Sequence, residues 1–475
     1  MVRWITRGRV ALLGLALCAA GCGGGTSVPP RTPTAAPTPT APPTATPSAP
    51  APSPTPSSAS IEGWLTYHGN LARTGVDATS PPLSSPALAW RSPALDGPIW
   101  AEPLVDGGQV IVVTVGGSVY SLAAATGQVS WRTHVDDPIS RSDLPCGNVN
   151  PLGILSTPVI DPATQTIFVV AETTSASHEM VALSEADGSI LWRRSIDASA
   201  PGVVSLDQQQ RAALALAGGR VLATFGGLDG DCGTYKGYVV SVPENGSGPT
   251  DTYILPVANQ GGIWSPSGPS VDAAGDVFVA SGNSEVGSST TFDMSDSVIE
   301  LTPTLQVEGY FAPTDWRYLS QTDLDLGSTG PMLFGSEILI AGKDGVLYLL
   351  NSTALGGIGG QVASLGLGSG SFGGLAEDGT TVFVPTVRNL DAVSVQGSTL
   401  RLAWQGPATW PAILSGGGVW AVTRSGGDLV ALSPASGAQL YSLPLGSVED
   451  FTTPTAFAGQ LYVAAGDQII AVSGV

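Results

Sequence analysis

A short unit recurs along this chain, and it restricts the possible fold more than any other feature. In its clearest copy, Gly117–Trp131, an apolar run reaches the turn Thr126-Gly127, and a second run then ends in tryptophan. That order predicts a strand, a tight turn and a second strand, with glycine where a positive φ is needed. Near-copies occur at Met180–Trp192 and Asp428–Tyr441. Copies this far apart predict an array of small sheets.

The composition agrees with an almost entirely β structure and excludes one class of function. The 475 residues include 62 glycines and 38 prolines, which suit many short strands joined by turns. The net charge is −20 with only 18 lysines and arginines, so a surface that binds nucleic-acid phosphates is not expected. The 3 histidines are well separated in the sequence, which argues against a metal site built from several of them.

The N-terminus has the pattern of an export signal. Three arginines precede the apolar run 10–17, and the small residues 19–21 lead to Cys22. This stretch resembles the lipobox of bacterial lipoproteins, in which the cysteine is lipidated and becomes the mature N-terminus. The resemblance implies a signal peptide over residues 1–22 and an extracytoplasmic protein anchored to the bacterial membrane through Cys22. The alternative is plain cleavage near Ala20 or Gly21.

Residues 23–60 begin with three glycines, and from Thr26 to about Ser60 they consist almost entirely of proline, threonine, alanine and serine. Such a segment cannot bury a core, so we expect a disordered, extended stalk. The folded part is expected over residues 61–475.

Seven segments of the folded part each have the strand content of a four-stranded sheet. A final segment, Thr453–Val475, supplies only three strands, and Ala87–Arg91 is available as the missing outer strand. An N-terminal strand that completes the last sheet closes a ring and removes open edges, which a linear solenoid would have to cap. The sequence therefore predicts an eight-bladed β-propeller, or seven blades if a middle segment is misassigned. The seven segments are Glu102–Thr133, Thr157–Ser195, Arg211–Leu255, Trp264–Phe311, Gly330–Leu365, Phe372–Gln405 and Pro411–Leu443.

The region Trp64–Val475 resembles the propellers built from pyrroloquinoline-quinone (PQQ) repeats, and Trp64–Gly75 resembles the lead-in to many of them. This group includes the lipoprotein of the outer-membrane assembly machinery and the PQQ-dependent alcohol dehydrogenases. The repeat is specific for the fold. It does not decide the activity, because catalytic and non-catalytic members both carry it.

Several stretches resemble the cofactor site of the quinoprotein dehydrogenases. Trp264 stands where those enzymes place a tryptophan under PQQ, and Asn283 and Asp231 stand where they place ligands to calcium. An indole stacks on a planar quinone, and amide and carboxylate oxygens suit a hard cation. Alternatively, Trp264 is a core aromatic at a blade start and Gly282-Asn283 is a turn.

Lys343, in Ala341–Tyr348, resembles the basic residue that reaches the quinone oxygens, although Lys-Asp-Gly is also an ordinary hairpin turn. Upstream, Asp323 and Asp325 alternate on one face of an extended segment, a spacing that suits a bound cation or a solvated loop. The resemblance offers Asp293 and Asp296 as candidates for the catalytic base, without a clean match for either.

The cysteines depart from the dehydrogenase pattern. Where those enzymes carry two adjacent cysteines, this chain has Cys146 followed by Gly147, and Pro151 replaces a usual arginine. Cys232 is the other cysteine of the folded part, and in an exported protein the two thiols are expected to form a disulfide.

Two functions follow from these observations. The first is a lipid-anchored binding or scaffold propeller that takes a protein or small-molecule ligand on its top face. The alternative is an alcohol dehydrogenase that uses PQQ and calcium; it would lack haem, because the chain has no Cys-x-x-Cys-His motif.

Overall fold

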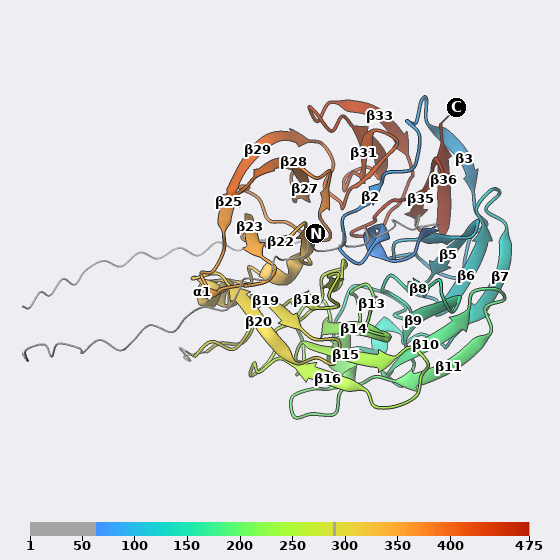
Figure 1. Ribbon diagram of the computed structural model, residues 1–475. Coiled ribbons are helices and arrows are strands. Elements are labelled where there is room, and N and C mark those ends of the chain that lie inside the picture. Colours follow the sequence, from blue (N-terminus) through green and yellow to red (C-terminus); the bar gives the residue numbers. More distant parts are fainter. Residues whose placement is uncertain (1–62, 288–290, 475) are drawn as a thin grey trace, which may run out of the picture. The chain divides into compact units, whose positions relative to one another are not determined.

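The computed structural model describes residues 63–287 and 291–474 (Figure 1). Eight β-sheets stand as blades around a ring, so the predicted eight-bladed propeller is confirmed and the seven-bladed alternative is wrong. The predicted signal peptide, stalk and lipidated Cys22 lie outside the described residues. Within the described ranges, no helix has the length and apolar character needed to cross a membrane.

The first four blades follow the predicted segments closely. Blade 1 contains β1 (Gly63–Trp64), β4 (Leu104–Asp106), β5 (Gln109–Val113), β6 (Ser118–Ala123) and β7 (Val129–His134). Blade 2 contains β8 (Val159–Asp161), β9 (Thr166–Glu172), β10 (His178–Ser184) and β11 (Ile190–Ser195). Blade 3 contains β12 (Gln208–Gln209), β13 (Ala215–Ala217), β14 (Arg220–Gly227), β15 (Tyr238–Pro243) and β16 (Asp251–Ile254). Blade 4 contains β17 (Ser270–Val271), β18 (Val277–Ala280), β19 (Val298–Leu301), β20 (Val307–Ala312) and β24 (Gly357–Ile358).

The other four blades complete the ring. Blade 5 contains β21 (Met332–Phe334), β22 (Glu337–Ala341), β23 (Val346–Asn351) and β25 (Ala363–Gly366). Blade 6 contains β26 (Ala376–Glu377), β27 (Thr381–Pro385), β28 (Leu390–Gln396) and β29 (Thr399–Gly406). Blade 7 contains β2 (Val76–Asp77), β30 (Ile413–Ser415), β31 (Gly418–Val422), β32 (Asp428–Leu432) and β33 (Gln439–Pro444). Blade 8 contains β3 (Ala87–Arg91), β34 (Thr455–Phe457), β35 (Gln460–Ala465) and β36 (Gln468–Ser473).

Helices are few and short. They are α1 (Trp316–Thr322) and the 3₁₀ turns η1 (Tyr67–Gly69), η2 (Arg141–Asp143), η3 (Ser205–Asp207) and η4 (Leu326–Ser328).

The last blade closes the ring as the sequence predicts. Strand β3 pairs antiparallel with β36, with Ala87 opposite Ser473 and Arg91 opposite Ile470. Blade 8 therefore takes its outer strand from the beginning of the folded part and its other three strands from the end of the chain. This pairing covers the edge of β36 that would otherwise be open.

The two marks of the repeat, a turn glycine and a terminal tryptophan, meet at the joints between blades. The indole Nε1 of Trp131 on blade 1 donates to the carbonyl of Glu185 on blade 2 at 3.1 Å. Gly188 in that same turn has φ +71°, and a Cβ there would lie 2.4 Å from the Trp131 ring. The same pairing of rings and glycines occurs at Trp90 with Gly127, Trp192 with Gly246 and Trp404 with Gly437. The repeat therefore encodes the packing of one blade against the next.

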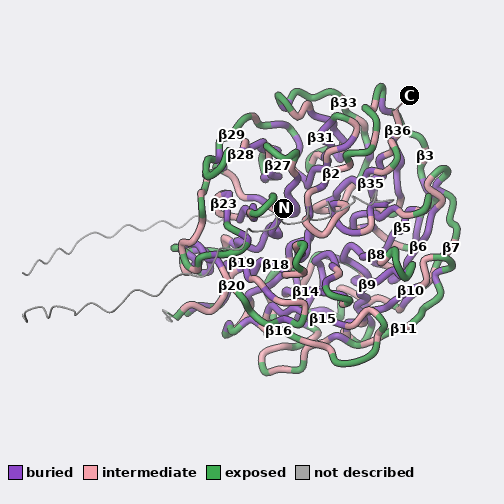
Figure 2. The backbone as a smooth tube through the Cα atoms, viewed as in Figure 1, coloured by how far each residue is buried: buried purple, intermediate pink, exposed green. Residues whose placement is uncertain are grey.

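Burial changes from the middle to the rim of each blade (Figure 2). The middle strands are almost wholly buried, as in β9, whereas the outer strand β7 alternates exposed and half-buried residues. The N-terminal lead-in is tied into this core. The fully buried guanidinium of Arg73 donates to the carbonyls of Leu214 on blade 3 and Pro269 at the start of blade 4.

Candidate functional site

A cavity of about 230 Å³ opens among loops at one end of the blades. These loops connect successive blades or join the two middle strands of a blade. Part of its wall is aromatic, from Trp100, Trp264, Phe372 and Phe451. The four residues predicted for a quinone and its cation come from three blades, yet all line this cavity: Asp231, Trp264, Asn283 and Lys343.

Lys343 is a residue of the β22–β23 turn, as the hairpin interpretation predicts, and its side chain also reaches the cavity. Its Nζ lies 2.7 Å from Asp323 Oδ1 and 2.8 Å from Asp325 Oδ2. The same ammonium lies 5.6 Å from the centre of the Trp264 ring. Burial lowers the pKa of Lys343, but the two carboxylates outweigh that effect, and the net shift is upward. The cation held by Asp323 and Asp325 in this structure is thus the lysine.

Asp325 connects several of the cavity residues, although the sequence did not assign it to the site. Its carboxylate accepts from Trp264 Nε1 at 3.1 Å and from the backbone N–H of Asn283 at 2.8 Å, in addition to Lys343. Its side chain is only 3% exposed. The signal for this role was its alternation with Asp323, which predicted a bound cation but not which one.

Asp231 lines the cavity from the loop between β14 and β15. Its Oδ1 accepts a 2.5 Å hydrogen bond from the hydroxyl of Tyr235. Burial raises the pKa of Asp231, and the charges of Asp325 and Asp323 raise it further, whereas the Tyr235 hydrogen bond opposes the shift.

The two candidate bases lie away from the cavity lining. Asp293 accepts from the hydroxyls of Ser284 and Ser295, both at 2.7 Å. Asp296 is fully buried and accepts from Ser320 Oγ at 2.6 Å, and burial raises its pKa well above the usual range. Neither residue is among those that line the cavity.

The expected disulfide is present between Cys146 and Cys232, whose Cα atoms are 6.1 Å apart. It joins the connection between blades 1 and 2 to the β14–β15 loop of blade 3. Gly230 and Asp231, which directly precede Cys232, line the cavity. The bridge therefore fixes one wall of the site.

A second cationic group, Arg211, lines the cavity and was not predicted. Its guanidinium lies between two rings, 5.4 Å from the centres of both Trp100 and Phe451. It donates to the carbonyls of Asp450 at 3.2 Å and Leu155 at 3.5 Å. In the sequence, Arg211 is only the first residue of the third predicted segment, and no motif or spacing indicates that its side chain would line a cavity.

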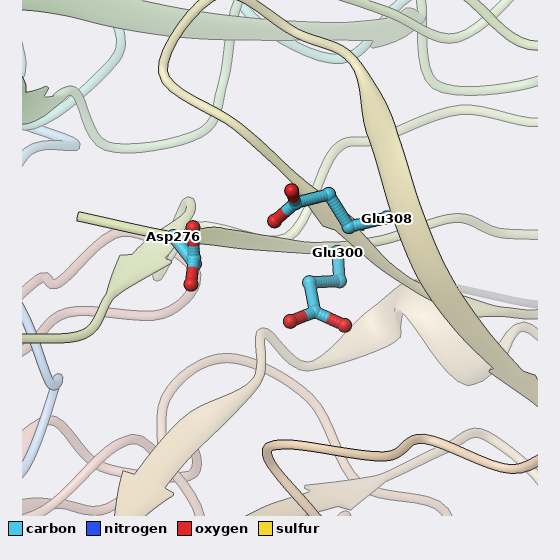
Figure 3. A group of neighbouring side chains, drawn as sticks. All are labelled: Asp276, Glu300 and Glu308. Carbon is cyan, nitrogen blue, oxygen red and sulfur yellow. The ribbon is translucent and has the colours of Figure 1, made fainter. Parts of the chain in front are cut away.

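Acidic side chains close enough to share a metal ion occur elsewhere in the described part of the chain. Asp276, Glu300 and Glu308 each offer a carboxylate oxygen within 4.8 Å of the others (Figure 3). All three belong to blade 4: Asp276 lies in the turn before β18, Glu300 on β19 and Glu308 on β20. None of them lines the cavity.

Comparison with known proteins identifies the architecture. The family model for outer membrane protein assembly factor BamB matches residues 83–228. The resemblance to PQQ-repeat propellers is confirmed. No curated protein sequence matches the chain.

Solved structures of alcohol dehydrogenases and of BamB are both similar to this propeller fold. Quinohemoprotein alcohol dehydrogenase from Comamonas testosteroni has a TM-score of 0.67 at 15% identity, covering 87% of this chain and 81% of that one. A europium-containing methanol dehydrogenase has a TM-score of 0.68 at 13% identity, and the match covers 87% of this chain and 98% of that one. BamB from Moraxella catarrhalis has a TM-score of 0.55 at 14% identity, and the match covers 82% of this chain and 99% of that one. At these identities the likeness concerns the fold alone, so the function has to be argued from the site.

Proposed function

We propose that this PQQ-repeat propeller is a binding module that takes a small ligand in its top-face cavity and does not catalyse alcohol oxidation. The observation that carries the proposal is the position of Lys343. Its ammonium neutralises Asp323 and Asp325 and lies over the Trp264 indole, where a planar quinone would have to stack.

The cavity also fits PQQ and calcium poorly in other respects. Its volume, about 230 Å³, is below the roughly 300 Å³ at which small-molecule pockets usually begin. A cation placed on Asp325 would have to displace the lysine from a 2.8 Å ion pair. The lining therefore supports a compact ligand better than a fused-ring cofactor with a metal.

A PQQ- and calcium-dependent dehydrogenase is the second candidate, and one observation favours it. The oxygen donors Asp231, Asn283 and Asp325 line the same cavity as Trp264 and Lys343. Asp325 also lines the cavity, so it could serve as the catalytic base in place of Asp293 and Asp296, which do not line it. In that function Asp231 and Asn283 would hold the ion, Trp264 would lie under the quinone, and PQQ would accept the hydride or electrons of the alcohol.

A spectroscopic titration separates the two functions at the level of binding. The full-length chain is titrated with PQQ in the presence of calcium, and separately with europium(III), the ion named for one structural neighbour. The binding module predicts no saturable change in the quinone absorption with either ion. Stoichiometric PQQ binding that requires the ion would contradict it.

We also propose that the propeller is displayed outside the cytoplasm on a lipid anchor at Cys22. The disulfide Cys146–Cys232 suits an oxidising compartment, and the stretch before Cys22 resembles a lipobox. A Cys22→Ser variant should leave the membrane fraction, because the lipid carries the attachment. If the variant still partitions with membranes, the anchor is not a lipid on Cys22.

A further inference from the structure

A buried cationic group of the cavity, Arg211, lacks a matching counter-charge. Arg211 is only 7% exposed, and no carboxylate of the described residues lies within 4 Å of its guanidinium. Two backbone carbonyls accept from it, whereas a guanidinium carries five N–H donors. The carboxylates of Glu449 and Asp450 act on it only through space. Since a buried charge without a partner is costly, the remaining donors are available to a ligand.

A neutral donor lines the same cavity. Gln209 precedes Arg211 by two residues, lines the same cavity and is only 8% exposed. Its Nε2 makes no hydrogen bond within the described part of the chain. Buried side-chain amides are nearly always hydrogen-bonded, so an unpartnered amide in the lining that also holds Arg211 points to a missing acceptor.

We propose that Arg211 and Gln209 form an anion subsite that takes the carboxylate of a small organic acid. This inference rests on the proposed binding function and names its ligand class. The guanidinium fork offers two parallel N–H groups to a carboxylate, and Gln209 adds a third donor. The planar faces of Trp100 and Phe451 fix the guanidinium, which reduces the entropy lost when the ligand binds.

The remaining lining restricts the acid further. The cavity volume of about 230 Å³ corresponds to about seven or eight water molecules, so the ligand is compact. The aromatic ring of Phe372, which also lines the cavity, suits a flat apolar body. Asp231 and Asp450 also line the cavity, and their charges disfavour a dianion. A monocarboxylate is therefore preferred over a phosphate.

Benzoate is the probe, with the neutral isostere benzamide and the dianion phenylphosphonate as matched comparisons. Each is titrated calorimetrically into the full-length chain. We expect benzoate to bind at least tenfold more tightly than either comparison, because only benzoate pairs with Arg211 without adding a second negative charge. Equal binding of benzamide would overturn the anion subsite but leave the proposed binding function standing. Preference for phenylphosphonate would overturn the carboxylate assignment, and no binding of any probe at millimolar concentrations would overturn the subsite.

Three variants separate ligand recognition from structural support. Arg211→Met should weaken benzoate binding about tenfold to a hundredfold, the loss expected for a hydrogen bond to a charged group. Gln209→Met should weaken it several-fold while leaving the melting temperature unchanged or higher, because it removes an unsatisfied buried donor. Arg132→Met is the control, since Arg132 stacks on Tyr120 outside the cavity, and binding should not change.

Unchanged benzoate affinity in Gln209→Met and Arg211→Met would contradict the proposal even if both variants fold. A positive dye-reduction assay with PQQ would instead contradict the proposed function, so the two failures are distinguishable.

Discussion

The ammonium of Lys343 lies 2.8 Å from the carboxylate of Asp325, and that carboxylate also accepts from the indole of Trp264. This three-residue contact joins blades 4 and 5 at the cavity. It gives the residues that resemble a quinone site a structural role of their own.

Replacing the lysine tests that role. Lys343→Met removes the cation and leaves Asp325 buried without its ion-pair partner. The free energy of unfolding should fall by about 2 kcal/mol, below the 3–5 kcal/mol of a fully buried pair because Asp323 is largely exposed. Chemical denaturation measures the loss. The Lys343→Met, Asp325→Asn double variant should lose less than the single variant, and an equal or larger loss would show that the pair does not stabilise the fold.

The joint between blades 8 and 1 predicts a large effect from a single methyl group. Gly127 has φ +70°, and an added Cβ would lie 2.4 Å from the Trp90 ring. Gly127→Ala should therefore destabilise the protein by more than about 2 kcal/mol, through both the backbone conformation and the clash. Gly219→Ala is the matched control, because Gly219 has φ +75° with open space around the new Cβ. Equal losses in the two variants would mean that the ring contact contributes nothing.

Much of this architecture could be predicted from the sequence, because the repeat carries both halves of the joint. Gly127 and Trp131 mark a turn and a strand end, and Ala87–Arg91 was the apolar segment left to complete the last blade. Propeller closure leaves few alternatives once the repeats are counted.

The site could be predicted only where residues match a known pattern. Trp264 and Lys343 were found in that way. Arg211 and Gln209 were not, because their importance depends on which neighbours they lack, and the sequence does not show that. The sequence also suggested that Asp323 and Asp325 hold a cation without showing that Lys343 would be that cation.

The disulfide predicts a further measurable stabilisation. Cys146 and Cys232 are separated by 86 positions, and closing a loop of that length contributes about 4 to 5 kcal/mol in the chain-entropy model. The Cys146→Ser, Cys232→Ser double variant should lose about that much free energy of unfolding. Mass spectrometry of unreduced peptides provides the direct check, and two free thiols in the purified protein would contradict the bridge.

His178 on blade 2 predicts a pH dependence of stability. Its ring is fully buried, with Nδ1 2.8 Å from Asp197 and Nε2 3.3 Å from Glu172, the latter without hydrogen-bond alignment. Burial lowers the pKa of His178, but the two carboxylates outweigh it and raise the pKa to about 9. Because the folded pKa exceeds the unfolded value of about 6.5, the stabilisation is complete below pH 6.5 and is lost as the pH rises through 9.

The difference in pKa corresponds to about 3 kcal/mol, so the wild type should lose about that much more free energy of unfolding than His178→Gln across this window. Denaturation curves at intervals from pH 6 to 10 measure the difference. Parallel pH profiles for the two proteins would show that His178 does not titrate in the folded state.

Alcohol-dependent dye reduction tests the central claim most directly. The purified full-length chain is incubated with PQQ and calcium, and reduction of an artificial electron acceptor is followed on addition of primary alcohols. If the Lys343 ammonium remains paired with Asp325 and over the Trp264 ring, the protein binds no PQQ there. The acceptor should then be reduced no faster than in a control with PQQ and calcium but without protein. Alcohol-dependent reduction that is lost in Lys343→Ala would contradict the account and establish the dehydrogenase.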